Sequence, residues 1–230
     1  EELYGIRFGA MGMKETYIKC GNLEQNGVRS DFVNIANLSN RPMEVGFMDV
    51  SDNLSIKVTP NPVPPRGTAE LEFTVSASRE KWGRNDYWAT PVVNGQAVKA
   101  SNGDSRIGFW AFTKENFSGL TDEEKAKGSR PMFDASTYSF GKIKAGETVH
   151  ATFEFTNKGS STFCVYKVDV NACKWSHSDI PAVAPGEKAK FRVHLDTSKL
   201  PKGEALAIVT LTTNSPHRPI VNLFISGWIE

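Results

Sequence analysis

The sequence lacks long apolar runs, an excess of charge of one sign and a dense set of cysteines. No apolar run approaches the roughly 18 residues that cross a bilayer as a helix. The 230 residues carry 27 Lys and Arg against 26 Asp and Glu, so we expect no charged surface for nucleic acid or an anionic membrane. Three cysteines are too few for a disulfide framework. These absences argue against a membrane-spanning protein, a nucleic-acid binder and a disulfide-held scaffold.

The cysteine count leaves two alternatives open. Cys164 and Cys173 could pair, with Cys20 left over, or all three could remain thiols. The count therefore does not indicate the redox compartment.

One stretch, residues 138–157, organises the rest of the chain. Tyr138 and Phe140 alternate with polar residues, and alternation returns from Val149 to Phe155. Gly141 and the later Gly146 supply the turn between the two runs. Alternation with a period of two predicts two half-buried strands of a β-sheet.

The same pattern occurs 120 residues earlier, because Cys20-Gly21 precedes Phe140-Gly141 by that interval. Matched positions continue at the same offset, as in Val33, Ile35, Asn37, Val45, Val50, Val63, Pro65, Leu71, Phe73 and Val75. The match ends with Gly108-Phe109-Trp110 near Ser226-Gly227-Trp228, at an offset of 118. A repeat of this length predicts two domains of one fold. It also predicts that Cys20, at the position of Phe140, is a small buried apolar group.

The expected organisation is a lead-in segment (1–13), which forms either a short edge strand or a linker, then domain one (14–112), a linker (113–131) and domain two (132–230). Strands are expected at 15–20, 28–36, 43–50, 54–59, 68–76, 87–93, 104–112, 136–140, 148–156, 162–170, 180–184, 188–195, 205–213 and 219–229. Asn94-Gly95 favours a type I′ hairpin turn. Short strands separated by frequent turns indicate an all-β chain of two tandem immunoglobulin-like β-sandwiches.

The linker contains the only helix that we expect. In Thr121-Asp-Glu-Glu124 the Thr hydroxyl can accept from the amide of Glu124, whose carboxylate can accept from that of Thr121. Gly128 then ends a helix of one to two turns.

Domain two also carries the motifs of a known family. Phe140-Gly141-x-Ile143-x-x-Gly146-Glu147 is followed by Phe153-x-Phe155-x-Asn157-x-Gly159, Ala184-Pro185-Gly186-Glu187, Thr213-Asn214 and Ile225-Ser-Gly227. The pattern resembles the bacterial immunoglobulin-like domain-of-unknown-function family 1573, akin to the ASPM/SPD-2/Hydin-type β-sandwiches. The resemblance covers domain two end to end, with domain one as a diverged copy. It implies export to the periplasm or cell surface, often as a lipoprotein, and no established catalytic activity.

Two departures from the family bear on function. Many members have a Cys-Gly-Cys motif where this chain has Ala172-Cys173-Lys174, so a metal or redox role there would lack its second ligand. Members often have a further domain before the pair, so we expect that an N-terminal domain is missing here.

No catalytic, metal or cofactor site is expected. Residues 176–179 read Ser-His-Ser-Asp, but a catalytic triad is assembled by geometry across a fold, and we interpret this stretch as a solvated turn. His150, His177, His194 and His217 show no metal-ligand spacing, and no phosphate-binding or dinucleotide motif is present.

The candidate interaction surface is the aromatic cluster around Arg84, formed by Trp82, Tyr87 and Trp88. Exposed aromatic residues beside charges can stack on sugars or anchor a protein interface. The alternative is structural: Trp88 would fill the core between the sheets, and Trp82 would pack on the strand ends.

We therefore expect a non-enzymatic module of a bacterial cell envelope that binds protein or glycan, or that spaces other domains. One alternative is a structural subunit that assembles by strand addition, with a mobile N-terminal segment and a long unpaired edge. The other is a metal-dependent or hydrolytic enzyme, which would gather His and carboxylates in one pocket.

Overall fold

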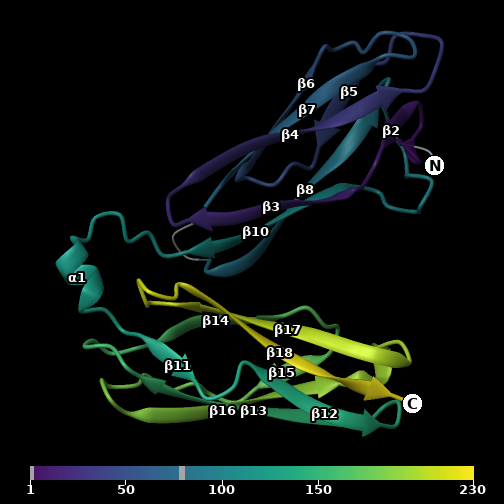
Figure 1. Cartoon of the computed structure of the whole chain (residues 1–230). Helices are drawn as coiled ribbons and strands as arrows, with labels where there is room; N and C mark the ends of the chain where they lie inside the picture. The colour runs from purple at the N-terminus through teal and green to yellow at the C-terminus, as the bar shows by residue number, and fades with distance from the viewer. Residues whose placement is uncertain (1–2, 78–80) are drawn as a thin grey trace. The chain divides into compact units, whose positions relative to one another are not determined.

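The computed structural model describes residues 3–77 and 81–230, in two compact units, Glu1–Thr113 and Lys114–Glu230. They are termed domain one and domain two. Figure 1 shows two layers of strands in each. The expected all-β fold with two immunoglobulin-like sandwiches is confirmed.

Domain one packs two five-stranded sheets face to face. The first, in spatial order, consists of β1 (Ile6–Phe8), β2 (Met11–Met13), β4 (Val28–Asn37), β7 (Thr68–Ser76) and β6 (Leu54–Thr59). The second consists of β3 (Tyr17–Glu24), β10 (Ile107–Lys114), β8 (Gly83–Val93) and β5 (Val45–Met48), with β9 (Gln96–Ala97) paired to β8. The apolar face of each strand forms one buried core between the layers.

Domain two repeats this plan with four strands in each sheet. One sheet has the order β11 (Pro131–Phe133), β13 (Thr148–Asn157), β16 (Lys188–Asp196) and β15 (Trp175–His177). The other has the order β12 (Thr137–Ile143), β18 (Ile220–Ile229), β17 (Gly203–Thr213) and β14 (Val165–Val170). A short 3-10 helix, η1 (Thr197–Lys199), follows β16. Strand β12 runs parallel to β18, whereas the other pairings in domain two are antiparallel.

A buried asparagine occupies the same place in both domains. Asn157 is fully buried, and its Nδ2 donates to Ser161 O at 2.8 Å and to Val183 O at 2.9 Å. Its Oδ1 accepts from the amides of Gly159 at 3.0 Å and Arg130 at 3.1 Å. One amide therefore satisfies four backbone groups where two loops and the start of β11 meet.

Asn37 holds the same position in domain one. Its Nδ2 donates to the carbonyls of Arg41, Val63 and Pro64, and its Oδ1 accepts from the amide and hydroxyl of Ser39. The pair lies 120 residues apart, so the repeat reproduces polar contacts as well as the apolar core.

The expected lead-in segment belongs to domain one instead. Its residues 1–2 lie outside the described part of the chain, but β1 and β2 form a hairpin, and β2 pairs with β4. Phe8 and Met11 are fully buried, and Met13 is 1% exposed. Gly and Ala between these apolar residues obscured the alternation. Strand β2 is the counterpart of β11, so the repeat begins earlier than expected.

Two other expectations for domain two are wrong. Residues 180–184 form no strand, apart from an isolated bridge between Val183 and Phe163, and the edge strand is β15. At the last strand the two domains correspond at an offset of 116 residues rather than 118. Gly108 N donates to Thr16 O, and Phe224 N makes the same bond to Ser136 O, 120 residues after Thr16, so Gly108 corresponds to Phe224. The offset falls because the loop before β18 is shorter than the loop before β10.

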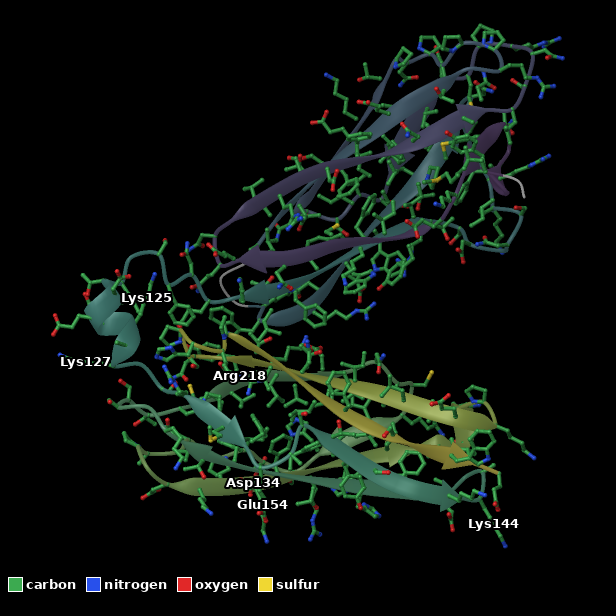
Figure 2. The ribbon with its side chains drawn as sticks, in the orientation of Figure 1. Lys125, Lys127, Asp134, Lys144, Glu154 and Arg218 are labelled. Atoms are coloured by element: carbon green, nitrogen blue, oxygen red, sulfur yellow. The ribbon has the colours of Figure 1, made fainter. Side chains whose placement is uncertain are left out.

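Two turn predictions are confirmed. Asn94 and Gly95 have φ values of 51° and 80°, as a type I′ turn requires, and they connect β8 to β9. The linker helix α1 (Asp122–Ala126) has both hydrogen bonds of the capping box, between Thr121 and Glu124. Figure 2 labels Lys125 and Lys127 on and directly after this helix.

The segment after α1 is docked on domain two. Ser129 is 1% exposed, its Oγ donates to Asn214 Oδ1 at 3.0 Å, and its carbonyl accepts from Ser215 Oγ at 2.5 Å. The segment before α1 is held as well, because Tyr166 OH donates to Glu115 Oε1 at 2.7 Å. Residues 114–131 therefore belong structurally to domain two.

Candidate functional site

The candidate residues lie on both faces of β8. Successive side chains of a strand alternate, so Arg84, Asp86 and Trp88 point outward and Tyr87 points into the core. Tyr87 is only 5% exposed, and this burial raises the pKa of its hydroxyl. The prediction that Tyr87 belongs to an interaction surface is therefore wrong. Trp82 lies directly before β8 and is partly buried.

Trp88 lies half-buried on the outside of its sheet, so the alternative that it fills the core is also wrong. Its ring stacks on Tyr17 of β3, with centroids 5.6 Å apart and an interplanar angle of 23°. Both rings lie over Gly108 of β10, where a Cβ would approach Tyr17 to 2.4 Å and Trp88 to 2.6 Å. A glycine at this position is what allows the two rings to cover the sheet.

Cations cover the faces of the outward rings. The Arg106 guanidinium lies 3.9 Å from the centroid of the Trp88 ring, and that of Arg84 lies 4.4 Å from the centroid of Trp110. Lys19 Nζ also lies 5.4 Å from the Trp110 ring. Such cation–π contacts are attractive by about 0.5–1 kcal/mol at exposed sites.

A polar chain of hydrogen bonds fixes the remaining side chains. The Tyr17 hydroxyl donates to Asp86 and accepts from Arg84 Nη2 at 2.7 Å. Burial, and then the hydrogen bond to Asp86, raise the pKa of Tyr17, so its hydroxyl remains protonated at neutral pH. The six residues Tyr17, Arg84, Asp86, Trp88, Arg106 and Trp110 are termed the aromatic–arginine face.

A hollow of about 420 Å³ adjoins this face. Tyr17, Trp88 and Arg106 line one part of it, and Thr16 and Asp104 line another. Thr16 Oγ1 donates to Asp104 Oδ2 at 2.6 Å. The hollow thus offers aromatic surface, one guanidinium and one carboxylate, which suits contact with a polar ligand rather than bond making.

The residues with catalytic potential lie elsewhere. Ser176 and His177 are on the exposed strand β15, which corrects our interpretation of this stretch as a turn. His150 and His194 face each other across β13 and β16, with their Nδ1 atoms 2.6 Å apart, although their spacing in the sequence did not indicate it. Among residues 3–77 and 81–230, no group of three His, Cys, Asp or Glu is placed to hold a metal ion.

All three cysteines are free thiols. Cys20 is 5% exposed, as expected of a small core residue, and burial raises the pKa of its thiol to about 11. Cys164 is partly buried, which also raises the pKa of its thiol, whereas Cys173 is exposed.

We expect Cys173 to react first with a thiol reagent such as 5,5′-dithiobis(2-nitrobenzoic acid) at pH 8. A pKa near 11 leaves little Cys20 thiolate at this pH, and burial blocks access, so Cys20 should react only after unfolding. Cys173→Ser should abolish the fast release of chromophore. Fast reaction in that variant would contradict the assignment.

Comparison with known proteins addresses the identity of the second domain. Residues 132–229 match the model of a family described as protein of unknown function, DUF1573. Domain two belongs to the DUF1573 family. The match covers this domain from its first sheet to its last strand, which confirms the resemblance carried by its Phe, Gly and Asn motifs.

Solved structures extend the comparison to the tandem. A crystal structure of a protein of unknown function from Porphyromonas gingivalis W83 matches 96% of this chain and 100% of its own, with a TM-score of 0.73 and 14% sequence identity. The ASH / PapD-like domain 7 of human CEP192 matches 50% of this chain and 96% of its own, with a TM-score of 0.38 and 13% identity. No curated protein sequence matches the chain. The Porphyromonas likeness supports the fold of a DUF1573 domain preceded by a second sandwich.

Within the described ranges, no helix has the length and apolar character to span a membrane.

Proposed function

We propose that the chain is a non-enzymatic binding module of a bacterial cell envelope, and that a partner protein binds the aromatic–arginine face of domain one. The observation that carries the proposal is the gathering of Trp, Tyr and Arg on one outer sheet face, with Trp88 next to Arg106. These three residue types dominate the binding energy of protein interfaces. The guanidinium groups of Arg84 and Arg106 already cover ring faces on which a sugar would have to stack, so a protein partner is favoured over a glycan.

A glycan is the second candidate ligand. The adjoining hollow of about 420 Å³ falls within the usual size of small-ligand sites. Asp104 and Arg106 could hydrogen-bond sugar hydroxyls while Trp88 supplies an apolar wall.

The location in the envelope and the absence of catalysis rest on the family resemblance. The rival, a metal-dependent or hydrolytic enzyme, would need further ligands beside the paired His150 and His194. Domain spacing remains compatible with either ligand, because it requires only the tandem fold.

Binding of the full chain to solubilised envelope proteins and to a glycan array tests the proposal. Trp88→Ala combined with Arg106→Ala should lower capture of a specific protein at least about tenfold, as expected for an interface centre. The matched control is Trp228→Ala, which removes a tryptophan that is 49% exposed in domain two. Equal capture by all three folded proteins would contradict the proposed face, and a loss confined to the array would favour the glycan.

A further inference from the structure

In domain one the N-terminal strand β1 adds to the first sheet beside β2 and forms its edge. Strand β1 pairs with β2, with Phe8 opposite Met11 and Ile6 opposite Met13. On its other side β1 meets the loop after β9, where Arg7 O accepts from Ser101 N at 2.8 Å. The strand is thus held between an edge strand and a loop.

Domain two has the same edge strand without such a cover. Arg130 O accepts from Lys158 N at 2.7 Å, as Ala10 O accepts from Leu38 N at 2.8 Å, so β11 stands where β2 does. Strand β11 ends its sheet, and no other strand of the described residues pairs with its outer side. The chain reaches β11 from helix α1, whereas β2 is reached through β1.

A hollow of about 750 Å³ lies at this edge. It is lined by Arg130, by β11 with residues 134–136, and by His217 and Arg218 of the loop between β17 and β18. Arg130 Nη2 lies 3.3 Å from His217 Nδ1, and the Arg218 guanidinium lies 5.9 Å from the centroid of the Phe133 ring. This loop is the counterpart of the loop that contacts β1 in domain one. The hollow therefore corresponds to the place that β1 occupies in domain one.

The backbone of β11 offers hydrogen-bonding groups to this hollow. Arg130 O and Asp134 N both bond toward β13, so alternation directs the backbone groups of Pro131 and Phe133 outward. Pro131 has no N–H, and β11 has three residues, so only a short segment can pair with it. Specific recognition must then come from side chains.

The side chains of the hollow favour an apolar residue next to a carboxylate. Phe133 is partly buried, and Met132 is 57% exposed. Two arginines, Arg130 and Arg218, line the hollow against one carboxylate, that of Asp134. Figure 2 labels Arg218, in the loop before β18, and Asp134, directly after β11.

We propose that β11 accepts a short extended segment of a partner protein, as β2 accepts β1, and that this segment carries an apolar residue beside an acidic one. The apolar side chain lies against Phe133, and the carboxylate faces Arg218 and Arg130. This binding mode is strand addition at an exposed sheet edge. It is independent of the aromatic–arginine face, which lies in the other domain.

Two labelled peptides test the proposal by fluorescence anisotropy with the full chain. One copies residues 4–9, and the other carries Arg7→Glu. We expect saturable binding of the Glu peptide, with at least about tenfold weaker binding of the Arg peptide, because like charges oppose docking. Arg218→Glu in the chain should reverse this order. Arg192→Glu, on the exposed outer face of β16, should leave it unchanged.

Amide hydrogen exchange then locates the bound peptide. Binding at the edge should slow exchange at Phe133 and leave domain one unchanged. Absence of saturable binding, the same order of affinities in Arg218→Glu, or protection confined to other residues would each overturn the proposal.

Discussion

Replacing Asn157 by aspartate should lower the free energy of unfolding of domain two by about 4 kcal/mol. The new carboxylate has nearly the shape of the amide but no N–H group. It would place an acceptor against Ser161 O, 2.8 Å from the present Nδ2, and against Val183 O at 2.9 Å. Because the site is fully buried, neither water nor rotation of the side chain can relieve the contact.

Chemical denaturation of the full chain measures this effect. The transition assigned to domain two should move to lower denaturant concentration, and that of domain one should not. Asn37→Asp should instead destabilise domain one, since Asn37 Nδ2 donates to the equivalent carbonyls there, those of Arg41 and Val63. Asn222→Asp is the matched control, because this residue is exposed and its Oδ1, which aspartate retains, accepts from Thr210 Oγ1. A loss below about 1 kcal/mol for Asn157→Asp would contradict the buried-amide argument.

The second large effect concerns Gly227 of β18, which lies against the ring of Phe140. A Cβ at Gly227 would lie 2.2 Å from two carbons of that ring, so the ring must move. Overpacking of this kind costs about 2 kcal/mol, and we expect Gly227→Ala to lower the free energy of unfolding of domain two by that amount.

Domain one shows how the strain can be relieved. With the offset of 116, Ala111 stands at the position of Gly227, and Cys20 stands at the position of Phe140. Domain one thus has the larger of the two small residues, Ala111, on the last strand, and it has the much smaller Cys20 in place of the Phe140 ring on the facing strand. Phe140→Cys in the Gly227→Ala background should therefore recover at least half of the loss.

The double-mutant cycle is measured by denaturation of the two single variants and the double variant. A coupling energy above about 1 kcal/mol is expected for residues in direct contact. Gly46→Ala serves as control, because the new Cβ would lie 4.0 Å from its nearest neighbour. Additive losses in the double variant would contradict the exchange of volume between the two strands.

The sequence predicted most strands because alternation and turn residues are local signals. Strand prediction failed where the alternating run was short, or where the strand is defined by its pairing with a distant segment. Strand β15 has three residues and no clear alternation of apolar and polar side chains. The 120-residue offset of the repeat nevertheless aligns it with β6, which would have predicted a strand there. For residues 1–13 the sequence left a short edge strand and a linker as alternatives, because the core residues Phe8 and Met11 are separated by Gly and Ala.

The candidate site was predicted only in part. Local sequence joined Arg84 to Trp88 but could not show which face of β8 is outward. Small or apolar residues at Gly83, Ala89 and Pro91 indicate the inward face, to which Tyr87 also belongs. Tyr17, Arg106 and Trp110 come from segments far apart in the chain, and only the pairing of β3, β10 and β8 brings them together.

The parallel pairing of β12 with β18 has a mechanical consequence. Once tension has passed β11, it acts on the start of β12 and the end of β18, so it pulls these two strands in opposite directions along their length. The hydrogen bonds between them are then loaded in shear and must break together, whereas an antiparallel hairpin pulled at its open end separates one bond at a time. Domain two is therefore built to resist stretching along the chain.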